Sequence, residues 1–524
     1  MDKDIAQTKS RLDKKEHRFI HTPVFKAILQ ISIPGLIMMF AFALYSVVDV
    51  IISLYFGTIN SNDPSQVLTA VDIRSAISST QSINTMCFAL IGCLAIGSAT
   101  RIPILLGKKD NNLKPFIGTS ISSLFFCSIL VIAIFSPLSE SLINSQIVHS
   151  SQPGNANLET VRKYAWWYIN IFIWGIPLYA FSFYSGSLLR NEGFIYISIV
   201  ANIVSNILNG IGDFIFLKYF HWSLIGSAVS TDISWLISLL IMYSYVLYRR
   251  NEVVFLSAFR FLKIRWSYVA VIILMGLSTL IRNSGMSFNA YLVNIFLNHL
   301  PAPSKYANSA MFHGFYLSLF GAIGQIIMIT VMPLFGVIQS SSSFIGYNFG
   351  KKEYKRIRKA IWSILIVASM YLVFIELIIM IFPNVFLNLF EGDISGIPNF
   401  NEYQNMYHSV GDIILRVIFS LFPLLGIQIM AQAILQSLNK PIQSIIAASL
   451  RSFIVFIPVS AILYLIETHI TVTGNWWLLF FFSWTITDII SSFVSFFMGR
   501  KIYHNLESIK IIGIDKQKIA ISTD

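Results

Sequence analysis

Apolar runs long enough to cross a lipid bilayer recur along almost the whole of this 524-residue chain. A membrane-spanning helix needs about 20 consecutive, predominantly apolar residues. Only 12% of the residues are charged and 55% are hydrophobic, so no soluble domain of any size is left over. The sequence therefore predicts an all-α integral membrane protein. Its twelve predicted transmembrane helices lie at 28–57, 77–106, 115–140, 163–189, 194–219, 223–248, 267–297, 306–343, 357–383, 410–437, 441–466 and 473–499.

The polar breaks between these spans alternate in charge. Most of the 37 Lys and Arg residues lie in the N-terminus, in or beside the breaks after even-numbered spans, and in the C-terminus. The breaks after odd-numbered spans hold only Arg74, Arg162, Lys163, Lys218 and Lys305. Cytoplasmic loops carry the excess of Lys and Arg in multi-pass membrane proteins. We therefore expect both termini to be cytoplasmic and the protein to lie in the plasma membrane.

A faint internal repeat divides the chain in two. GKKD at 107–110 follows the second span, and GKKE at 350–353 follows the eighth, six spans later. With the basic segment between the sixth and seventh spans, it predicts two pseudo-symmetric lobes of six helices, as in many secondary transporters. The predicted parts are a cytoplasmic N-terminal segment, an N-lobe, a basic cytoplasmic linker, a C-lobe and a cytoplasmic C-terminal tail, at 1–26, 27–248, 249–266, 267–499 and 500–524.

Composition and motifs argue against several classes of function. The formal charge of +12 is not gathered into the basic stripe, with interleaved aromatic residues, that marks nucleic-acid binding. The three cysteines, Cys87, Cys93 and Cys127, lie in apolar runs without a C-x-x-C pair, which indicates neither a disulfide framework nor a zinc site. GxxxxGK[ST] is absent, so ATP is not the direct energy source. We expect a small-molecule substrate, a lipid bilayer as surroundings, no cofactor and no enzyme activity.

The stretch NGIGDFIF at 209–216 places a carboxylate inside an apolar span. A charged group near the bilayer centre costs at least a few kcal/mol, so Asp213 should face protein or trapped water. Asn206, Asn209 and Asp213 are spaced by three and four residues, so they lie along one helical face. A carboxylate beside an amide can carry a proton or supply oxygen ligands to sodium. The alternative is a hydrogen bond that only packs two helices together.

A second carboxylate, Asp49, lies in the first span beyond Pro34, where we expect a kink. In the predicted orientation, Asp49 and Asp213 both fall in the outer half of the membrane. They can therefore share one chamber and titrate as a coupled pair. For Asp49, too, a role in helix packing is the alternative.

Four segments of this chain, in order, resemble the multidrug and toxic compound extrusion (MATE) family. They are ISIPGLIMMFAFALYSVVDVIISLYFG in the first span, LRNEGFIYISIVANIVSNILNGIGDFIFLKYFHWSLIGSAVSTD from the fourth to the sixth, GVIQSSSSFIGYNFGKKEYKRIRKA from the eighth to the ninth, and SWTITDIISSF in the twelfth. The family belongs to the multidrug/oligosaccharidyl-lipid/polysaccharide flippase superfamily. The resemblance implies a secondary active antiporter for multidrug efflux, in which proton or sodium entry drives alternating access and xenobiotic export.

The resemblance is to the N-lobe-coupled, DinF-like type. Such members use an Asp in helix one, N-x-x-x-D in helix five and a hydroxyl in helix six for cation or proton coupling, which match Asp49, Asn209, Asp213 and Thr231. The family's Asn in helix four is not matched, because FYSGSLLRNEG offers Ser185 or Ser187 instead. The coupling ion, H⁺ or Na⁺, therefore stays open. No acid lies between Glu252 and Glu353, so this chain lacks the C-lobe cation site of other members.

The remaining candidates are polar residues and a substrate chamber. Asn206, Asp232, Ser185 and Ser187 are candidates for additional polar lining. An unpaired cation at mid-depth is costly, so Arg282 should meet an acid, a carbonyl or an anionic substrate group. Glu376 and Asp488 read as structural acids. The candidate substrate chamber comprises Met38, Met39, Phe42, Tyr45, Phe288 and Met311, although such residues are also ordinary membrane packing. We expect a monomer, and no metal ion besides Na⁺ at Asp49 and Asp213.

Two other functions compete with ion-coupled export. A flippase for lipid-linked saccharides would need a larger basic chamber able to hold pyrophosphate, and Arg282 is one cation where several are expected. An intramembrane enzyme would need a catalytic constellation, but neither H-E-x-x-H nor G-x-S-x-G occurs in the sequence.

The predicted orientation can be tested by labelling single cysteines introduced into a variant without native cysteines. Positions within 391–402 should react with a membrane-impermeant maleimide from outside the cell. Positions within 352–359 should react only after permeabilisation. The reverse pattern would overturn the topology.

Overall fold

The computed structural model describes residues 19–59, 68, 70–149, 158–249, 253–300, 315–390, 400–470 and 479–509. Met311 and the ends of the predicted terminal segments lie outside these residues. The first half of the chain forms six long helices, α2 (Val24–Phe56), α3 (Ala70–Lys108), α4 (Leu113–His149), α5 (Leu158–Asn191), α6 (Ile195–Lys218) and α7 (Ser223–Tyr248). One isolated β-bridge, between Ile59 and Leu68, interrupts the helical pattern of the described chain.

Helix α8 (Val254–Ala258) and the short turn η2 (Phe259–Phe261) lead into the second half. Its helices are α9 (Trp266–His299), α10 (Phe315–Gly350), α11 (Tyr354–Ile381), α12 (Pro383–Phe390), α13 (Phe400–Phe419), α14 (Phe422–Ser437), α15 (Pro441–Ser449), α16 (Phe456–Ile470) and α17 (Phe482–His504). The short turns η6 (Leu479–Phe481) and η7 (Leu506–Ser508) flank α17.

Eleven described helices are long and apolar enough to cross a membrane, and the bent pair α13–α14 supplies a twelfth span. The pair bends by 44° just before Pro423, which lacks the N–H that a continuous helix would use. Another span, α15–α16, contains the π-helical turn η5 (Leu450–Val455). Pro458 follows this turn and cannot donate to the carbonyl four residues earlier. The predicted all-α, twelve-helix architecture is therefore confirmed.

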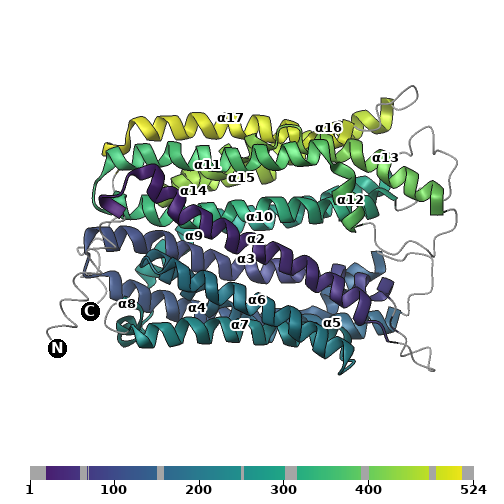
Figure 1. The fold of residues 1–524 in the computed structure, drawn as a ribbon, viewed down its shortest axis with the longest axis horizontal. Coiled ribbons are helices and arrows are strands. Elements are labelled where there is room, and N and C mark those ends of the chain that lie inside the picture. Colours follow the sequence, from purple (N-terminus) through teal and green to yellow (C-terminus); the bar gives the residue numbers. More distant parts are fainter. Residues whose placement is uncertain are drawn as a thin grey trace.

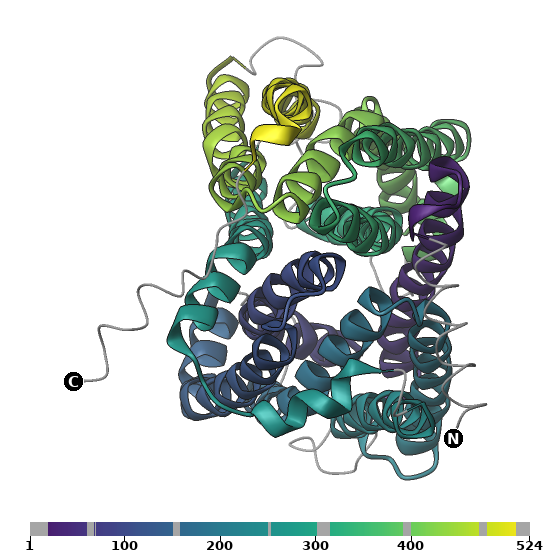
Figure 2. The same cartoon turned by 90° about the vertical axis from the view of Figure 1, so that its left-hand side faces the viewer.

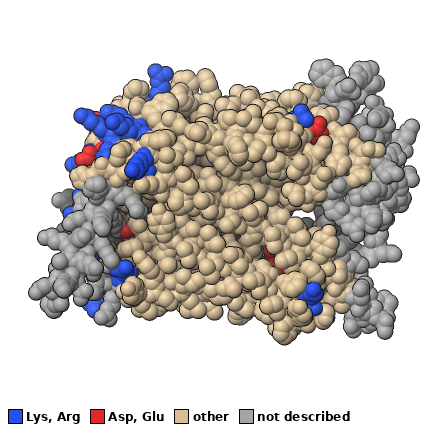
Figure 3. Space-filling model, in the orientation of Figure 1, with Lys and Arg blue, Asp and Glu red and all other residues tan. Residues whose placement is uncertain are grey.

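The helices form two bundles (Figure 1). One contains α3–α7 and the other α10–α17, and each has its own apolar core. The described chain begins and ends at the same end of the molecule, where Lys and Arg gather in Figure 3. We call this the basic end. Between it and the opposite end lies a broad band almost without charge, as a bilayer requires.

The first helix of each half crosses from one bundle to the other. Near the basic end, α2 packs into the core of the C-terminal bundle through Ala27 and Ile31. This contact is visible where α2 starts, in purple, beside the green helices in Figure 2. At its far end, α2 packs against α6, where the rings of Phe56 and Phe214 meet. Conversely, α9 enters the N-terminal core through Ile272 and the C-terminal core through Val293. Each crossing helix therefore connects the two bundles mechanically.

The GKKD and GKKE repeat lies where the bundles meet at the basic end. A Cβ atom on Gly107 would overlap the carbonyl oxygen of Tyr347, and one on Gly350 would overlap that of Ile104. The two contacts are reciprocal, because Ile104 and Tyr347 are separated by the same offset as the two glycines. A pseudo-two-fold axis thus passes between α3 and α10, and glycine is needed because the backbones touch.

Side chains on either side of this glycine contact also join the bundles. Arg101 Nη1 donates to Asn439 Oδ1 at 3.0 Å, and Ser343 Oγ donates to Asn191 Oδ1. The two asparagines occupy corresponding positions in the two halves: Asn191 ends α5, and Asn439 lies just beyond the end of α14. Arg190 Nη2 adds a 2.8 Å hydrogen bond to Gln339 Oε1. We call the glycine pair and these bonds the basic-end junction; it holds the bundles together on that side.

Substitution of Gly350 by Val should force the bundles apart at the basic end, at a cost of about 1–3 kcal/mol from overpacking. Spin labels attached to Lys114→Cys in α4 and Lys355→Cys in α11, in a protein without native cysteines, would report the distance between the two bundles by double electron–electron resonance. We expect a longer distance component in Gly350→Val. Gly499→Val is the matched control, because a Cβ atom there meets open space. An unchanged distance distribution in folded Gly350→Val would show that the contact is not a constraint.

Candidate functional site

Three helices of the N-terminal side bring the two predicted carboxylates together. Asp49 comes from the far half of α2, and Asp213 from α6, where its side chain is 0% exposed. The two carboxyl groups lie close enough to interact directly. Helix α7 completes the group, because Ser227 Oγ donates to Asp49 Oδ1 at 2.8 Å. In Figure 3, acidic atoms are visible in a recess of the lower bundle, away from both ends.

The amide of Asn209 is held one turn from Asp213. Its Nδ2 donates to Thr231 Oγ1 at 3.1 Å and approaches Ser230 Oγ at 3.3 Å. Ser230 Oγ in turn donates to the carbonyl oxygen of Asn209 at 2.9 Å. The hydroxyl of Tyr45 lies 3.2 Å from Thr231 Oγ1. Because Asn209 Nδ2 is hydrogen-bonded to α7, the amide oxygen Oδ1 must point away from α7.

Three buried oxygens in this cluster have no hydrogen-bond donor among the described residues. They are Asn209 Oδ1 and both carboxylate oxygens of Asp213. More than about 90% of buried polar atoms in proteins are hydrogen-bonded, so such a group of acceptors is unusual. Two neighbouring carboxylates also repel each other unless a proton or a cation lies between them. The arrangement is therefore suited to a proton or to a hard cation such as Na⁺, for which Asp49, Asp213 and Asn209 would supply oxygen ligands.

Sequence reasoning missed three polar residues around this cluster. Ser227 and Ser230 are one turn and one residue before Thr231 in GSAVSTD, so their spacing on one helical face was a usable signal. Tyr168 of α5 lies near both acids. Only its depth in the fourth span, similar to that of the acids, could have suggested it. Tyr45, expected in a substrate chamber, instead contacts the polar cluster through Thr231.

Other predicted polar residues lie elsewhere. Ser187 accepts a 2.8 Å hydrogen bond from Arg190 Nη2 near the basic-end junction, far along α5 from the acids. Ser185 is on the same stretch, and its hydroxyl is buried without a described partner. Asp232 packs against Gly175 of α5 rather than toward Asp49. Asn206 lies one turn from Asn209, and no described residue bonds its Nδ2.

The described residues of the predicted chamber lie on the two crossing helices, α2 and α9. Met38 is buried in the C-terminal core, and Met39 packs against that core. The rings of Phe42 and Tyr45 are 6.2 Å apart on α2. Phe288 of α9 lies beside Phe453, with ring centroids 6.1 Å apart. Met38 and Met39 are therefore part of ordinary core packing, while Phe42, Tyr45 and Phe288 keep their place as candidates for the chamber.

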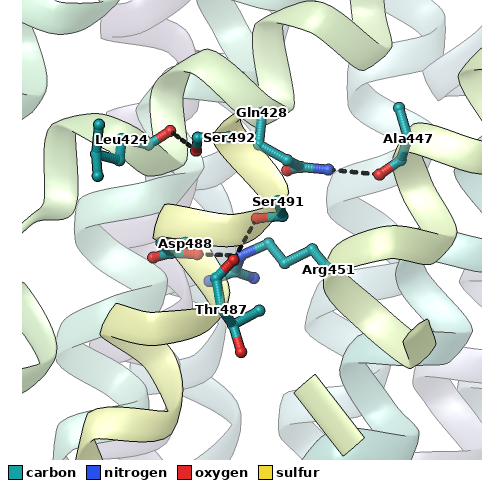
Figure 4. Close-up of polar contacts among 8 residues, drawn as sticks. All are labelled: Leu424, Gln428, Ala447, Arg451, Thr487, Asp488, Ser491 and Ser492. Atoms are coloured by element: carbon teal, nitrogen blue, oxygen red, sulfur yellow. Dashed lines mark hydrogen bonds and ion pairs between the residues drawn. The ribbon is translucent and has the colours of Figure 1, made fainter. Parts of the chain in front are cut away.

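The C-terminal bundle contains a different arrangement, a fixed ion pair (Figure 4). Arg451 Nε donates to Asp488 Oδ1 at 2.7 Å, and the Asp488 side chain is only 5% exposed. The π-helical turn η5 carries Arg451 and α17 carries Asp488, and Gln428 of α14 donates to the Ala447 carbonyl of α15 at 2.8 Å nearby. Because the arginine neutralises Asp488, this carboxylate stabilises the bundle and is unsuited to exchanging an ion.

Arg282 lies halfway along α9. Its guanidinium carbon is 4.7 Å from the ring centroid of Phe335 on α10, and its Nε is 3.5 Å from Asn283 Oδ1. Both partners are neutral.

This sequence and its fold are similar to those of known proteins. The MatE family model matches residues 34–215 and 309–462. An uncharacterized protein of Mycoplasmoides gallisepticum is 24% identical over 511 residues, covering 86% of this chain and 85% of its own. The multidrug export protein MepA of Staphylococcus aureus (strain bovine RF122 / ET3-1) is 24% identical over 470 residues, covering 89% and 92%. A solved outward-facing multidrug resistance MATE family transporter superposes with a TM-score of 0.77 at 18% identity, covering 94% of this chain and 98% of that one.

The contrast between the two bundles predicts different effects of similar substitutions. Asp488→Asn leaves the half-buried Arg451 without its counter-charge and should cost about 3 kcal/mol, at the low end for a buried pair. Asp412→Asn, which breaks the more exposed pair of Asp412 with Arg416, should cost no more than about 1 kcal/mol. Thermal unfolding in detergent would compare them. The double change Arg451→Met with Asp488→Leu should recover much of the loss; equal stability of the two single variants would refute the structural role.

Proposed function

Because the chain belongs to the MatE family, whose members are membrane transporters and not enzymes, we propose that it is a secondary active antiporter. It exports small amphiphilic or cationic compounds and is driven by entry of protons or sodium ions. The observation that carries this proposal is the pair of Asp49 and Asp213, which lies in an apolar bundle without a fixed cation among its described contacts. The relative named as a multidrug export protein agrees with a substrate of this kind.

The driving ion would bind between α2 and α6. A proton or Na⁺ between Asp49 and Asp213 removes their repulsion and draws the far half of α2 toward α6 and α7. Its release would allow α2 to move away, with Pro34 as the bend. An ion can shift a conformational equilibrium only if it binds the two states unequally. Asp49 lies on the crossing helix α2 and Asp213 on α6, so a movement of α2 changes the distance between the carboxylates and with it the affinity for the ion.

The basic-end junction supplies the second element of alternating access. The positive-inside rule makes the basic end cytoplasmic, so the junction closes the transporter on that side. A transporter closed on the cytoplasmic side would take up ions from outside and release substrate outward. Separation of Gly107 from Gly350, with loss of the Arg190–Gln339 bond, would open the cytoplasmic side and release the ion there.

The carboxylates also bear on selectivity. An acidic pocket in a medium of low dielectric constant attracts a cation more strongly than bulk water does. Cationic amphiphiles of the ethidium type should therefore accumulate more in cells that lack the protein. If cells with and without the protein accumulated dye equally, and cells without it lost a lipid-linked sugar from the outer leaflet, the protein would be a flippase for lipid-linked saccharides instead.

Purified protein in liposomes with independently imposed proton and sodium gradients tests the coupling. Asp213→Asn keeps the side-chain shape but removes the titratable charge, so export should no longer respond to either gradient; Asp49→Asn should behave similarly. Asn209→Ala removes one neutral ligand and should slow export by about fivefold, equivalent to about 1 kcal/mol. Asp412→Asn, which removes a partly exposed carboxylate of α13 in the other bundle, is the control and should leave coupling intact.

The ion that restores export in wild-type protein identifies the coupling ion. Correctly folded Asp213→Asn and Asp49→Asn proteins that export at wild-type rates, with unchanged pH and sodium dependence, would disprove the N-terminal coupling model. The two acids would then have to be regarded as helix-packing groups.

A further inference from the structure

We propose that the C-terminal bundle binds the anionic group of an amphiphilic substrate, a carboxylate or a phosphate, at Arg282. This inference rests on the proposed transport function and extends its substrate class. Acidic and zwitterionic amphiphiles would then be transported as well as cations.

The direction of Arg282 follows from the face of α9 on which it lies. Met275 and Ser278 precede it by seven and four residues, so all three share one helical face. Gln436 Nε2 donates to the Met275 carbonyl at 2.6 Å, and Gln432 Nε2 approaches the Ser278 carbonyl at 3.3 Å. This face of α9 is therefore turned toward α14, inside the bundle. Arg282 continues this face and is half-buried, and Met286, one turn further along, is 43% exposed, so the buried face of α9 opens at Arg282.

The charge of Arg282 has no counter-charge within the described structure. No Asp or Glu occurs between Glu252 and Glu353, so neither α9 nor α10 can supply one. The described contacts of the guanidinium are the Phe335 ring and Asn283, both neutral. Arg451, on the same side of the molecule, is already neutralised by Asp488. A cation at this depth is costly unless something compensates it, and a bound anion would do so.

Two further polar atoms, on Ser278 one helical turn before Arg282 and on Gln432 of the facing helix, have no hydrogen-bond partner among the described residues. Ser278 and Gln432 are both 0% exposed, and neither Ser278 Oγ nor Gln432 Oε1 has a hydrogen-bond partner among the described residues. Buried polar atoms are normally hydrogen-bonded, so these two atoms are available to a polar ligand. Ser278 can donate to an anionic oxygen, and Gln432 Oε1 can accept from a hydroxyl or amine carried by the same ligand.

The geometry of the guanidinium fits an oxyanion. Arginine offers a planar fork of donors that matches carboxylate and phosphate oxygens two at a time. Only Nε of Arg282 makes a described hydrogen bond, and at 3.5 Å it is long. The stacking of Phe335 against the guanidinium restricts its orientation, while the two terminal nitrogens remain for a ligand. A matched pair of charges in opposite bundles then results, with the acids Asp49 and Asp213 in one and Arg282 in the other.

Binding of dansyl-undecanoate and of its uncharged methyl ester to the full-length protein in phosphatidylcholine nanodiscs tests the proposal. Arg282→Gln should weaken binding of the acid by about tenfold and leave the ester unchanged, since only the acid has a charge to lose. Arg282→Lys keeps the charge without the planar fork and should fall between. Arg260→Gln, which removes an exposed arginine of the linker, is the charge-matched control and should bind like wild type.

Equal loss of acid and ester binding in Arg282→Gln would mean that the residue only packs, and unchanged acid binding would mean that it has no contact with the anion; either result overturns the proposal. If Arg282→Gln does not fold, loss of acid binding alone in Arg282→Lys decides the question. Phosphatidylglycerol added to the nanodiscs distinguishes two sources of the anion. Displacement of the acid from wild type would identify a lipid headgroup, and undisturbed binding would identify a free amphiphile.

The two proposals fail in different ways. Failure of the antiport model would appear as export that ignores the ion gradients while acid binding still depends on Arg282. Failure of the anion site would appear as acid binding that ignores Arg282 while export still follows the gradients.

Discussion

An unpaired charge is expensive inside a bilayer, and this cost governs where each ionisable group of the protein lies. The C-terminal bundle meets it by fixing Arg451 against Asp488 at 2.7 Å. The N-terminal side instead places Asp49 and Asp213 together, surrounded by hydroxyl and amide groups. A permanent ion pair has nothing to exchange, whereas two carboxylates in contact need a proton or cation that can arrive and leave. The same physical constraint therefore gives stability in one bundle and a candidate coupling site in the other.

The crossing helices explain how such a site could act on the whole molecule. The far half of α2 carries Asp49, while its near half packs into the core of the opposite bundle. Packed cores resist gradual deformation and tend to move as units. A change in the distance between α2 and α6 would thus reach the C-terminal bundle directly. The backbone contact between Gly107 and Gly350 lies on the pseudo-two-fold axis, where a small rotation of either bundle alters the junction on both sides.

Much of the fold could be predicted because the bilayer simplifies the problem. Backbone groups in lipid must be satisfied within each segment, so long apolar runs become helices. Twelve spans, their alternation and the approximate equality of the two halves follow from that rule and from the placement of Lys and Arg. The bend before Pro423 and the π-helical turn before Pro458 were not predicted, since the response of a helix to proline depends on its neighbours. The separate helix α12 was likewise absent from the sequence-based spans.

The sequence by itself determined that Asn206, Asn209 and Asp213 share a face of one helix, and that the second half has no carboxylate in its first two helices. Helical periodicity and composition are local properties, so one chain suffices to read them. Only the tertiary structure decided that Asp49 meets Asp213, that Ser227 and Tyr45 join them, and that Ser187 belongs to a different region. It also decided that α2 and α9 cross from one bundle to the other and that Arg282 stacks on Phe335 of α10. Contacts between helices depend on their tilt and rotation, which are set by packing across the whole bundle and leave no periodic signal in the chain.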